Sequence, residues 1–214
     1  MRTIAVFGGT GGLGSAVVPL LEEKYDVISL GSKGVDITSI AQVRRFFLDH
    51  EIDIVINMSG KKHDCFIGEL SVGDLGPIKD MLDVNIMGNI NILTCCLPYM
   101  IQKGWGRVIA ISSIFAELNT PKNAIYSASK AFLDRLISVA NRENIKYGVT
   151  CNTIQLGYWD EGMSSRVEMK YQDAAKAKIG LKRFGNAKEL YNTIDFIIEN
   201  EYVCGTNLRI DGGI

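Results

Sequence analysis

Two residues spaced one helical turn apart could exchange a proton with an alcohol or a ketone. Tyr126 and Lys130 are four positions apart, and on a helix such residues are neighbours on one face. A free tyrosine has a pKa of about 10, and a nearby ammonium favours the phenolate and lowers that value. The pair therefore predicts a proton donor and acceptor for an alcohol/ketone couple.

Two polar residues upstream could complete such a site. Ser113 ends an apolar, β-prone run thirteen residues before Tyr126, where its hydroxyl could bind a substrate carbonyl oxygen and stabilise the developing charge. Ser112 is the alternative serine, one residue further away. Asn85 lies inside a predicted long helix, where asparagine is mildly unfavourable, and this indicates a role for its side chain.

A glycine-rich turn near the N-terminus predicts where cofactor phosphates bind. The apolar run 3–7 leads directly into glycines that open a predicted helix. Glycines let a pyrophosphate approach the main chain, and the helix start offers free N–H groups and a positive dipole end. The residues predicted to bind the cofactor here are Gly8, Thr10, Gly11, Gly12, Leu13 and Gly14.

The residues after the second predicted strand bear on cofactor choice. An acidic residue there binds the ribose 2′-OH of NAD, whereas a basic residue accommodates the 2′-phosphate of NADP. Ser32 and Lys33 follow the strand with no acid at its end, while Asp36 lies 22 residues past Gly14, near the expected position of a ribose acid. We expect NADP(H) to be preferred, with NAD(H) as the alternative.

Strand-like and helix-like segments alternate along the chain. This alternation predicts a parallel sheet covered on both faces, with right-handed crossovers. The expected fold is α/β, a Rossmann-type doubly wound parallel sheet in three layers, forming one domain over 1–214. Strands are predicted over 3–7, 27–30, 35–37, 52–57, 107–112, 149–155 and 207–210, and helices over 13–24, 40–50 (capped by Ser39), 78–102, 124–144 and 187–199.

The stretch 157–185 is the longest without strong apolar periodicity, and long insertions of this kind are usually functional lids. We predict that it covers the substrate, with Tyr158, Trp159 and Met163 facing the pocket. The basic residues between Arg166 and Arg183 would suit an anionic substrate, although an ordinary solvated helix explains those charges equally well.

Composition restricts the function further. The chain has 214 residues, is 47% apolar and carries a net charge of −1, which argues against nucleic-acid or membrane-surface binding. It has five cysteines without a Cys-x-x-Cys pair and only two histidines, so we expect reduced thiols and no metal site. The chain has neither a signal peptide nor an uninterrupted run of about 18 apolar residues, and a cytoplasmic location is the expectation.

Taken in order, these motifs resemble the classical short-chain dehydrogenase/reductase family, and among its members those like 3-ketoacyl-carrier-protein reductases. The resemblance spans the chain from Phe7 to the Asp211-Gly212-Gly213 end. The segment 57–60 is similar to the family's Asn-Asn-Ala-Gly element. The family's Asn-Ser-Tyr-Lys tetrad is matched by Asn85, Ser113, Tyr126 and Lys130.

The resemblance implies roles for these residues. Tyr126 would exchange the proton, Lys130 would lower its pKa and bind the nicotinamide ribose, Ser113 would orient the carbonyl, and Asn85 would hold a water in a proton relay. Further cofactor contacts are implied for Asp36, Ile37, Asn57, Ser59, Gly60 and Gly157. A homodimer or homotetramer is also implied, because the family commonly pairs the helices 78–102 and 124–144.

The chain departs from the family pattern at several positions. Leu156 replaces the proline before Gly157, Phe7 replaces a threonine, and Glu161 stands where a threonine often contacts the nicotinamide amide. The predicted activity is interconversion of a ketone or aldehyde and a secondary alcohol. Two alternatives are a catalytically silent NADP-binding regulatory module and a nucleotide-sugar-modifying enzyme, although the latter usually carries a longer C-terminal domain.

Overall fold

Six parallel strands form one sheet at the centre of the computed structural model, which describes residues 1–161 and 169–214. The strand order is β2-β1-β3-β4-β5-β6, and every neighbouring pair is parallel. The direction of winding reverses at β1, which pairs with β2 on one side and β3 on the other. The strands are β1 (Thr3–Phe7), β2 (Asp26–Leu30), β3 (Ile54–Asn57), β4 (Gly106–Ser113), β5 (Val149–Leu156) and β6 (Asn207–Ile210).

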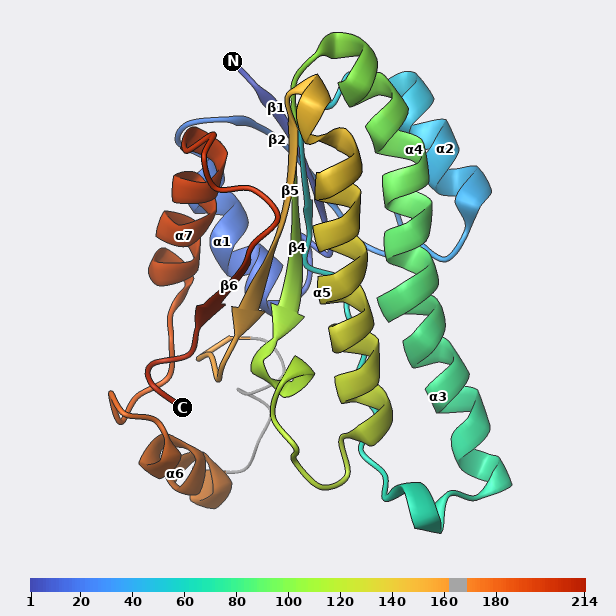
Figure 1. Ribbon diagram of the computed structural model, residues 1–214. Helices are drawn as coiled ribbons and strands as arrows, with labels where there is room; N and C mark the ends of the chain where they lie inside the picture. The colour runs from blue at the N-terminus through green and yellow to red at the C-terminus, as the bar shows by residue number, and fades with distance from the viewer. Residues whose placement is uncertain (162–168) are drawn as a thin grey trace.

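Helices cover both faces of the sheet and produce the predicted three layers (Figure 1). One face carries α1 (Gly12–Glu22) and α7 (Ala187–Glu199), which contact each other. The other carries α2 (Ile40–Asp49), α4 (Gly88–Lys103) and α5 (Ala124–Asn144). Short helical turns lie at Ile67–Glu69, Val72–Asp74, Ile114–Ala116 and Ile145–Tyr147.

The two faces contain separate apolar cores, and β1 contributes to both. Ile4 and Val6 pack in the core beneath α1 and α7, whereas Ala5 and Phe7 pack in the core beneath α2, α4 and α5. This division follows from the two-residue repeat of a strand, which points successive side chains to opposite faces. A strand covered on both sides favours apolar residues at successive positions, which explains the apolar run over 4–7.

The short strand predicted over 35–37 is wrong, and β2 is the edge of the sheet. Local hydrogen bonds explain the difference: the backbone N–H and hydroxyl of Thr38 both donate to Oδ1 of Asp36, at 2.9 and 2.8 Å. Such Asx turns compete with strand pairing. Ile37 is nevertheless buried in the core against the helical layer, so its apolar character serves packing rather than a strand.

The predicted helix 78–102 is part of a longer helical run. It begins with α3 (Leu75–Leu82), continues through the π-helical segment η3 (Asp83–Met87), and ends with α4 at Lys103. Val72–Lys103 is long and apolar enough to cross a membrane by length and composition. It nevertheless contains no uninterrupted run of about 18 apolar residues. This run contacts α2 and α5, and three of its asparagines are buried, as is typical of a core helix. The three are Asn85, Asn89 and Asn91.

The stretch predicted as a lid contains one further helix, α6 (Met169–Lys178). Met163 and Arg166, to which the sequence assigned roles there, lie outside the described residues. The predicted cap of α2 is confirmed, because the Ser39 hydroxyl accepts from the backbone N–H of Gln42 at 3.5 Å.

Candidate active site

A cleft of about 500 Å³ opens at the carboxyl ends of β1, β3, β4 and β5. In a doubly wound sheet this edge is where ligands bind, at the point where the strand order reverses. The cleft extends from the glycine turn after β1 to the start of α5. Its lining includes most residues predicted for cofactor and substrate: Gly8, Thr10, Gly11, Gly12, Leu13, Gly14, Ser32, Asp36, Ile37, Ser59, Gly60, Ser113, Tyr126, Lys130, Gly157, Tyr158 and Trp159.

The glycine turn is closed so tightly that side chains would not fit. Gly8 has a φ of +78°, a conformation that favours glycine. A Cβ on Gly14 would lie 2.3 Å from the carbonyl oxygen of Gly8 and 2.7 Å from Cα of Gly9. Gly11 caps α1 without any side-chain hydrogen bond. The first N–H groups of the helix therefore remain available to an anion, as a dinucleotide pyrophosphate requires.

The end of the cleft that is predicted to hold the adenine is formed by the loop after β2. Ser32, Asp36 and Ile37 line it, whereas Lys33 does not. The loop is fastened to α4, because Asn91 donates to the carbonyl oxygen of Ile37 at 2.9 Å. The predicted contact of Lys33 with a 2′-phosphate therefore stays a prediction.

The segment after β3 forms the middle of the cleft. Ser59 and Gly60 line it directly. Asn57 is buried behind them, where its amide oxygen accepts from the backbone N–H of Ser59 at 3.0 Å and its amide nitrogen donates to Asn89 at 2.8 Å. Asn57 thus shapes the wall of the cleft from behind, without facing the space where a cofactor would lie.

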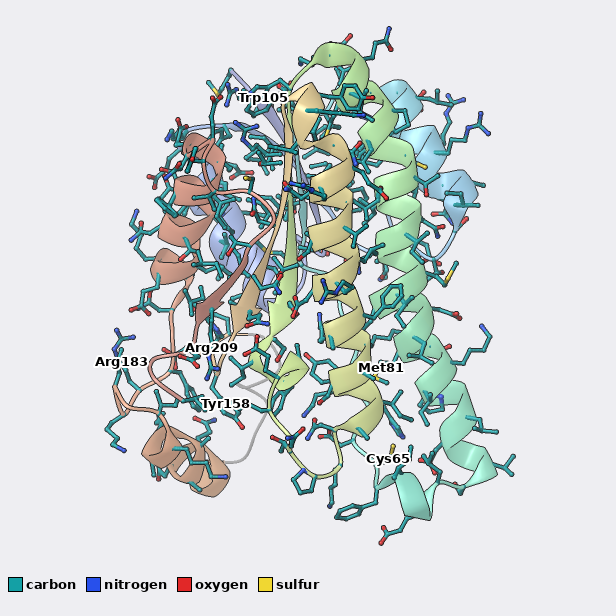
Figure 2. The ribbon with its side chains drawn as sticks, in the orientation of Figure 1. Cys65, Met81, Trp105, Tyr158, Arg183 and Arg209 are labelled. Atoms are coloured by element: carbon teal, nitrogen blue, oxygen red, sulfur yellow. The ribbon has the colours of Figure 1, made fainter. Side chains whose placement is uncertain are left out.

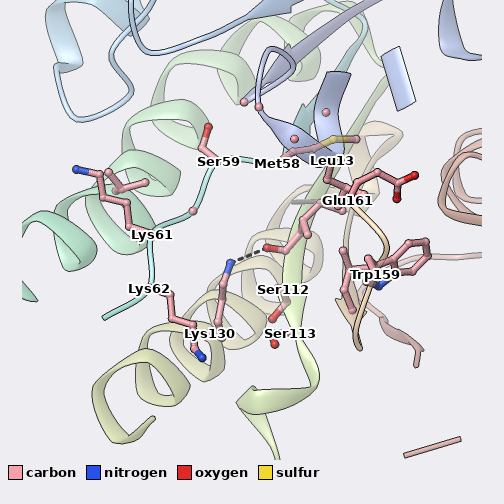
Figure 3. Close-up of a pocket in the computed structure, with 18 of the residues that line it drawn as sticks. Leu13, Met58, Ser59, Lys61, Lys62, Ser112, Ser113, Lys130, Trp159 and Glu161 are labelled. Carbon is pink, nitrogen blue, oxygen red and sulfur yellow. Dashed lines mark hydrogen bonds between the residues drawn. The ribbon is translucent and has the colours of Figure 1, made fainter. Parts of the chain in front are cut away.

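Ser113, Tyr126 and Lys130 meet at the other end of the cleft, the first from the end of β4 and the others from α5. The Lys130 ammonium donates to the carbonyl oxygen of Ile111 at 2.8 Å (Figure 3). Burial lowers the pKa of Lys130 to about 8, against an opposing influence from the carboxylate of Asp134. Lys130 therefore gains and loses its proton near neutral pH.

The pKa of Tyr126 is raised, because burial disfavours the phenolate; a hydrogen bond with Ser113 lowers it in part. The Nζ of Lys130 lies 6.0 Å from the centroid of the Tyr126 ring. The predicted lowering of the Tyr126 pKa by Lys130 is therefore wrong for the protein without ligands. The reason is geometric, since the ammonium is directed to the main chain of β4 and not to the phenol.

Asn85 lies behind the lining, in the π-helical segment. Its amide oxygen accepts from the backbone N–H of Lys61 at 2.9 Å, and its amide nitrogen donates to the Lys61 carbonyl and to Ser129. A Cβ on Gly60 would lie 3.5 Å from Nζ of Lys130 and 3.7 Å from Oδ1 of Asn85. Both side chains therefore border the same small space, and all four predicted tetrad residues gather in one corner of the molecule.

Sequence reasoning gave no role to Lys62 or Phe115, two residues that line the cleft. Lys62 and Phe115 lie beside Tyr126. Ser112, the alternative serine of the sequence, has a buried hydroxyl, and Glu161, predicted near the nicotinamide amide, has a buried Oε2. Neither atom has a hydrogen-bond partner among the described residues. The two lysines four and five residues after the predicted strand 52–57 were a usable signal for Lys62.

The predicted basic lining is not found among the described residues of the 157–185 stretch. Arg183 pairs with Glu189 of α7 at 2.6 Å, and Lys182 donates to the carbonyl of Ala177 at 2.7 Å. Figure 2 shows Tyr158 below the strand ends and Arg183 further out towards the molecular edge. Aromatic rings, not these cations, border the cleft from this stretch.

Comparison with known proteins identifies the class. Residues 20–214 match the family model described as enoyl-(acyl carrier protein) reductase. The chain belongs to the short-chain dehydrogenase/reductase family of NAD(P)-dependent oxidoreductases, within the group that this model describes.

Individual relatives are distant but similar over their whole length. Carbonyl reductase family member 4 of Xenopus laevis is 26% identical, with 100% of this chain and 98% of the relative covered. The 3-oxoacyl-(acyl-carrier-protein) reductase of Rickettsia typhi is 28% identical, with 100% and 96% covered. Among solved structures, ElxO with NADP bound has a TM-score of 0.88 at 20% identity, covering 99% of this chain and 97% of that one. This likeness supports the fold.

Proposed function

We propose that this protein reduces a ketone or aldehyde to a secondary alcohol with NADPH, and catalyses the reverse oxidation with NADP⁺. The observation that carries the proposal is the single cleft that joins the glycine turn to Ser113, Tyr126 and Lys130. Relatives named as carbonyl reductase and 3-oxoacyl-(acyl-carrier-protein) reductase support this reaction class.

The residues present fit a dinucleotide. The glycine turn leaves room and free N–H groups for a pyrophosphate, Asp36 and Ile37 border the adenine end, and Gly157 opens the nicotinamide end. A Cβ at Gly157 would lie 2.8 Å from Cα of Asp211, so the close packing of this segment against Asp211 depends on glycine. NADP(H) is favoured over NAD(H) because no acidic residue ends β2.

In the proposed reaction, Ser113 donates a hydrogen bond to the substrate carbonyl oxygen, and Tyr126 delivers a proton to that oxygen. Lys130, which titrates near pH 8, contacts the nicotinamide ribose and restores the proton of Tyr126. Asn85 holds the main chain at Lys61 and positions a water that leads protons to Lys130. The nicotinamide, when bound, supplies or accepts the hydride.

Reduction starts from the protonated phenol, the form that the raised pKa of Tyr126 favours, but the same shift makes the phenol a weaker acid. A phenol that keeps its proton is ready to donate it as negative charge develops on the carbonyl oxygen. Oxidation needs the phenolate instead, and the positive charge of a bound nicotinamide near the ring would favour it.

The test is NADPH oxidation, followed by absorbance, with a panel of ketones, aldehydes, 3-oxoacyl thioesters and nucleotide sugars, and NADH run in parallel. Turnover of a carbonyl substrate that is lost in Tyr126→Phe supports the proposal. Tight NADPH binding without turnover on the whole panel would instead favour the silent regulatory module, and turnover of nucleotide sugars alone would favour the nucleotide-sugar enzyme.

We further propose a cytoplasmic location and a homodimer or homotetramer formed through the helices 78–102 and 124–144. Exposed apolar side chains on α5, Phe132 and Val139, support the pairing. We also keep the proposal of one domain over 1–214 with a substrate lid over 157–185. Size-exclusion chromatography with light scattering tests the oligomeric state.

A further inference from the structure

Three consecutive residues after β3 can carry positive charge, but only one of them is directed into the catalytic end of the cleft. Lys61 borders the cleft but pairs with Asp80 of α3 at 3.6 Å, with about half of its side chain exposed. His63 pairs with Asp74 at 3.0 Å. Lys62 instead extends towards Lys130 and Ser113, whereas Lys61 is directed away from them (Figure 3).

The position of Lys62 is defined by two aromatic rings. Its Nζ lies 5.2 Å from the centroid of Phe115 and 5.7 Å from the centroid of Tyr126. Ammonium groups are attracted to the faces of such rings. The side chain is only 25% exposed. Lys62 therefore presents a charge directly beside the phenol that the proposed reaction uses.

Lys62 has an ion-pair partner that a ligand could replace. Asp64 contacts its Nζ at 2.9 Å, but half of the Asp64 side chain is exposed. An ion pair that is so open to solvent contributes little to stability. A second carboxylate in the cleft can therefore take the place of Asp64 at low cost. Charge-assisted hydrogen bonds of this kind are short and directional, so they would fix the orientation of a substrate.

No feature of fold or cofactor binding requires this cation. Lys62 makes no hydrogen bond to backbone in the described residues, and it lies at the Ser113 and Tyr126 end of the cleft, away from the glycine turn that receives phosphates. An apolar side chain of the same length would pack between the same rings. The charge is thus free to serve recognition.

We infer that Lys62 binds a carboxylate of the substrate, and that the preferred substrates of this protein are short oxo acids whose carboxylate lies a few bonds from the carbonyl. This inference rests on the proposed function and narrows its substrate class. The carbonyl oxygen would face Ser113 and Tyr126 while the carboxylate displaces Asp64 from Lys62. Thioester substrates, which lack that negative charge beside the carbonyl, would not use Lys62.

The test compares acids with their neutral esters. Acetoacetate and levulinate are assayed beside their methyl esters, with NADPH, on wild type, Lys62→Met, Lys62→Arg and the control Lys61→Met. We expect wild type and Lys61→Met to prefer the acids in kcat/KM. Lys62→Met should lose at least about tenfold of that preference without a matching loss on the esters, and Lys62→Arg should recover part of it. A partial folding defect changes both substrates alike and leaves the ratio intact.

Calorimetric titration of the same acids and esters provides a readout without turnover. A preference for the acids that Lys62→Met removes would support the inference even if no NADPH were oxidised, and that lack of oxidation would count against the proposed function alone. An acid preference that survives Lys62→Met, a wild-type preference for the esters, or absence of binding to both acids would overturn the inference.

Discussion

The two ends of the cleft are built by different means. At the phosphate end, main-chain atoms of the β1–α1 turn form the surface, and a Cβ on Gly14 would lie 2.3 Å from a carbonyl oxygen. At the chemical end, the surface consists of side chains from β4 and α5, and their properties depend on burial. The first end depends on shape and on free main-chain N–H groups, whereas the second depends on shape and on proton affinity.

This difference means that each end can be damaged separately. A change of one functional group at the chemical end should remove turnover and leave dinucleotide binding intact. A single methyl group at the phosphate end should weaken dinucleotide binding and leave the proton chemistry in place. Four substitutions test whether the two ends can be disabled independently, and the expected effect decreases from Tyr126 to Glu161.

Replacing the phenol is expected to have the largest effect. Tyr126→Phe removes the proton donor and keeps the ring that packs against Phe115. We expect kcat to fall by about 10³-fold or more, in the upper range for loss of a positioned acid, with the Kd for NADPH within about twofold of wild type. Stopped-flow kinetics and fluorescence titration measure the two quantities. Substantial residual turnover would show that another group supplies the proton.

Neutralising the buried amine should change how stability depends on pH. Because burial lowers the pKa of Lys130 from 10.5 to about 8, the unfolded chain binds more protons than the folded chain between those pH values. The free energy of unfolding of the wild type should therefore rise as pH increases through this window. Lys130→Met should lack that rise and be more stable below pH 8, by up to about 3 kcal/mol.

Chemical denaturation of wild type and Lys130→Met at pH 7, 8, 9 and 10 measures this difference. Loss of the hydrogen bond to Ile111 reduces the gain at every pH alike, so the slope is the decisive quantity. Parallel pH profiles for the two proteins would mean that Lys130 keeps an ordinary pKa in the folded state.

Adding a methyl group to the turn tests the phosphate end. Gly14→Ala places a carbon against the main chain of Gly8 and Gly9, and overpacking of this kind costs about 1–3 kcal/mol. We expect lower stability and weaker NADPH binding, measured by thermal unfolding and titration. Gly76→Ala is the matched control, since a Cβ there meets no atom within 4 Å. Equal effects of the two variants would refute the close-packed turn.

The smallest effect is expected at Glu161, which lines the cleft and whose buried Oε2 has no hydrogen-bond partner within 1–161 and 169–214. A carboxylate there favours the positively charged nicotinamide of NADP⁺ over the neutral ring of NADPH. Glu161→Gln should shift the ratio of the two Kd values a few-fold towards NADPH. Asp160→Asn, which alters a neighbouring carboxylate outside the cleft, is the control. An unchanged ratio would place Glu161 away from the nicotinamide.

Much of the fold could be predicted because both faces of the sheet are covered. Strands buried on two sides favour apolar residues, and the apolar runs in Thr3–Phe7 and Ile54–Asn57 stand out for that reason. The strand predicted over 35–37 failed because a short apolar pair can be buried by a loop as well as by a sheet. Hydrogen bonds from Thr38 to the carboxylate of Asp36 stabilise the loop instead of a strand.

The candidate site was predictable where position along the chain fixes position in space. Tyr126 and Lys130 share a helix, and Ser113 ends the strand before it, so their proximity follows from the elements. The direction of a flexible side chain does not follow in this way. Lys130 is directed to the carbonyl of Ile111, and Lys62 is held by rings from two other segments. Both depend on tertiary contacts that no local pattern encodes.

The helical run from Leu75 to Lys103 forms hydrogen bonds with segments at both ends of the cleft. Its π-helical segment carries Asn85, while four to six residues later Asn89 supports Asn57 and Asn91 fastens the loop at Ile37. Each residue of an α-helix advances by about 100°. Deleting one residue in this run would therefore rotate one set of asparagines away from its partners while the other set stayed in place.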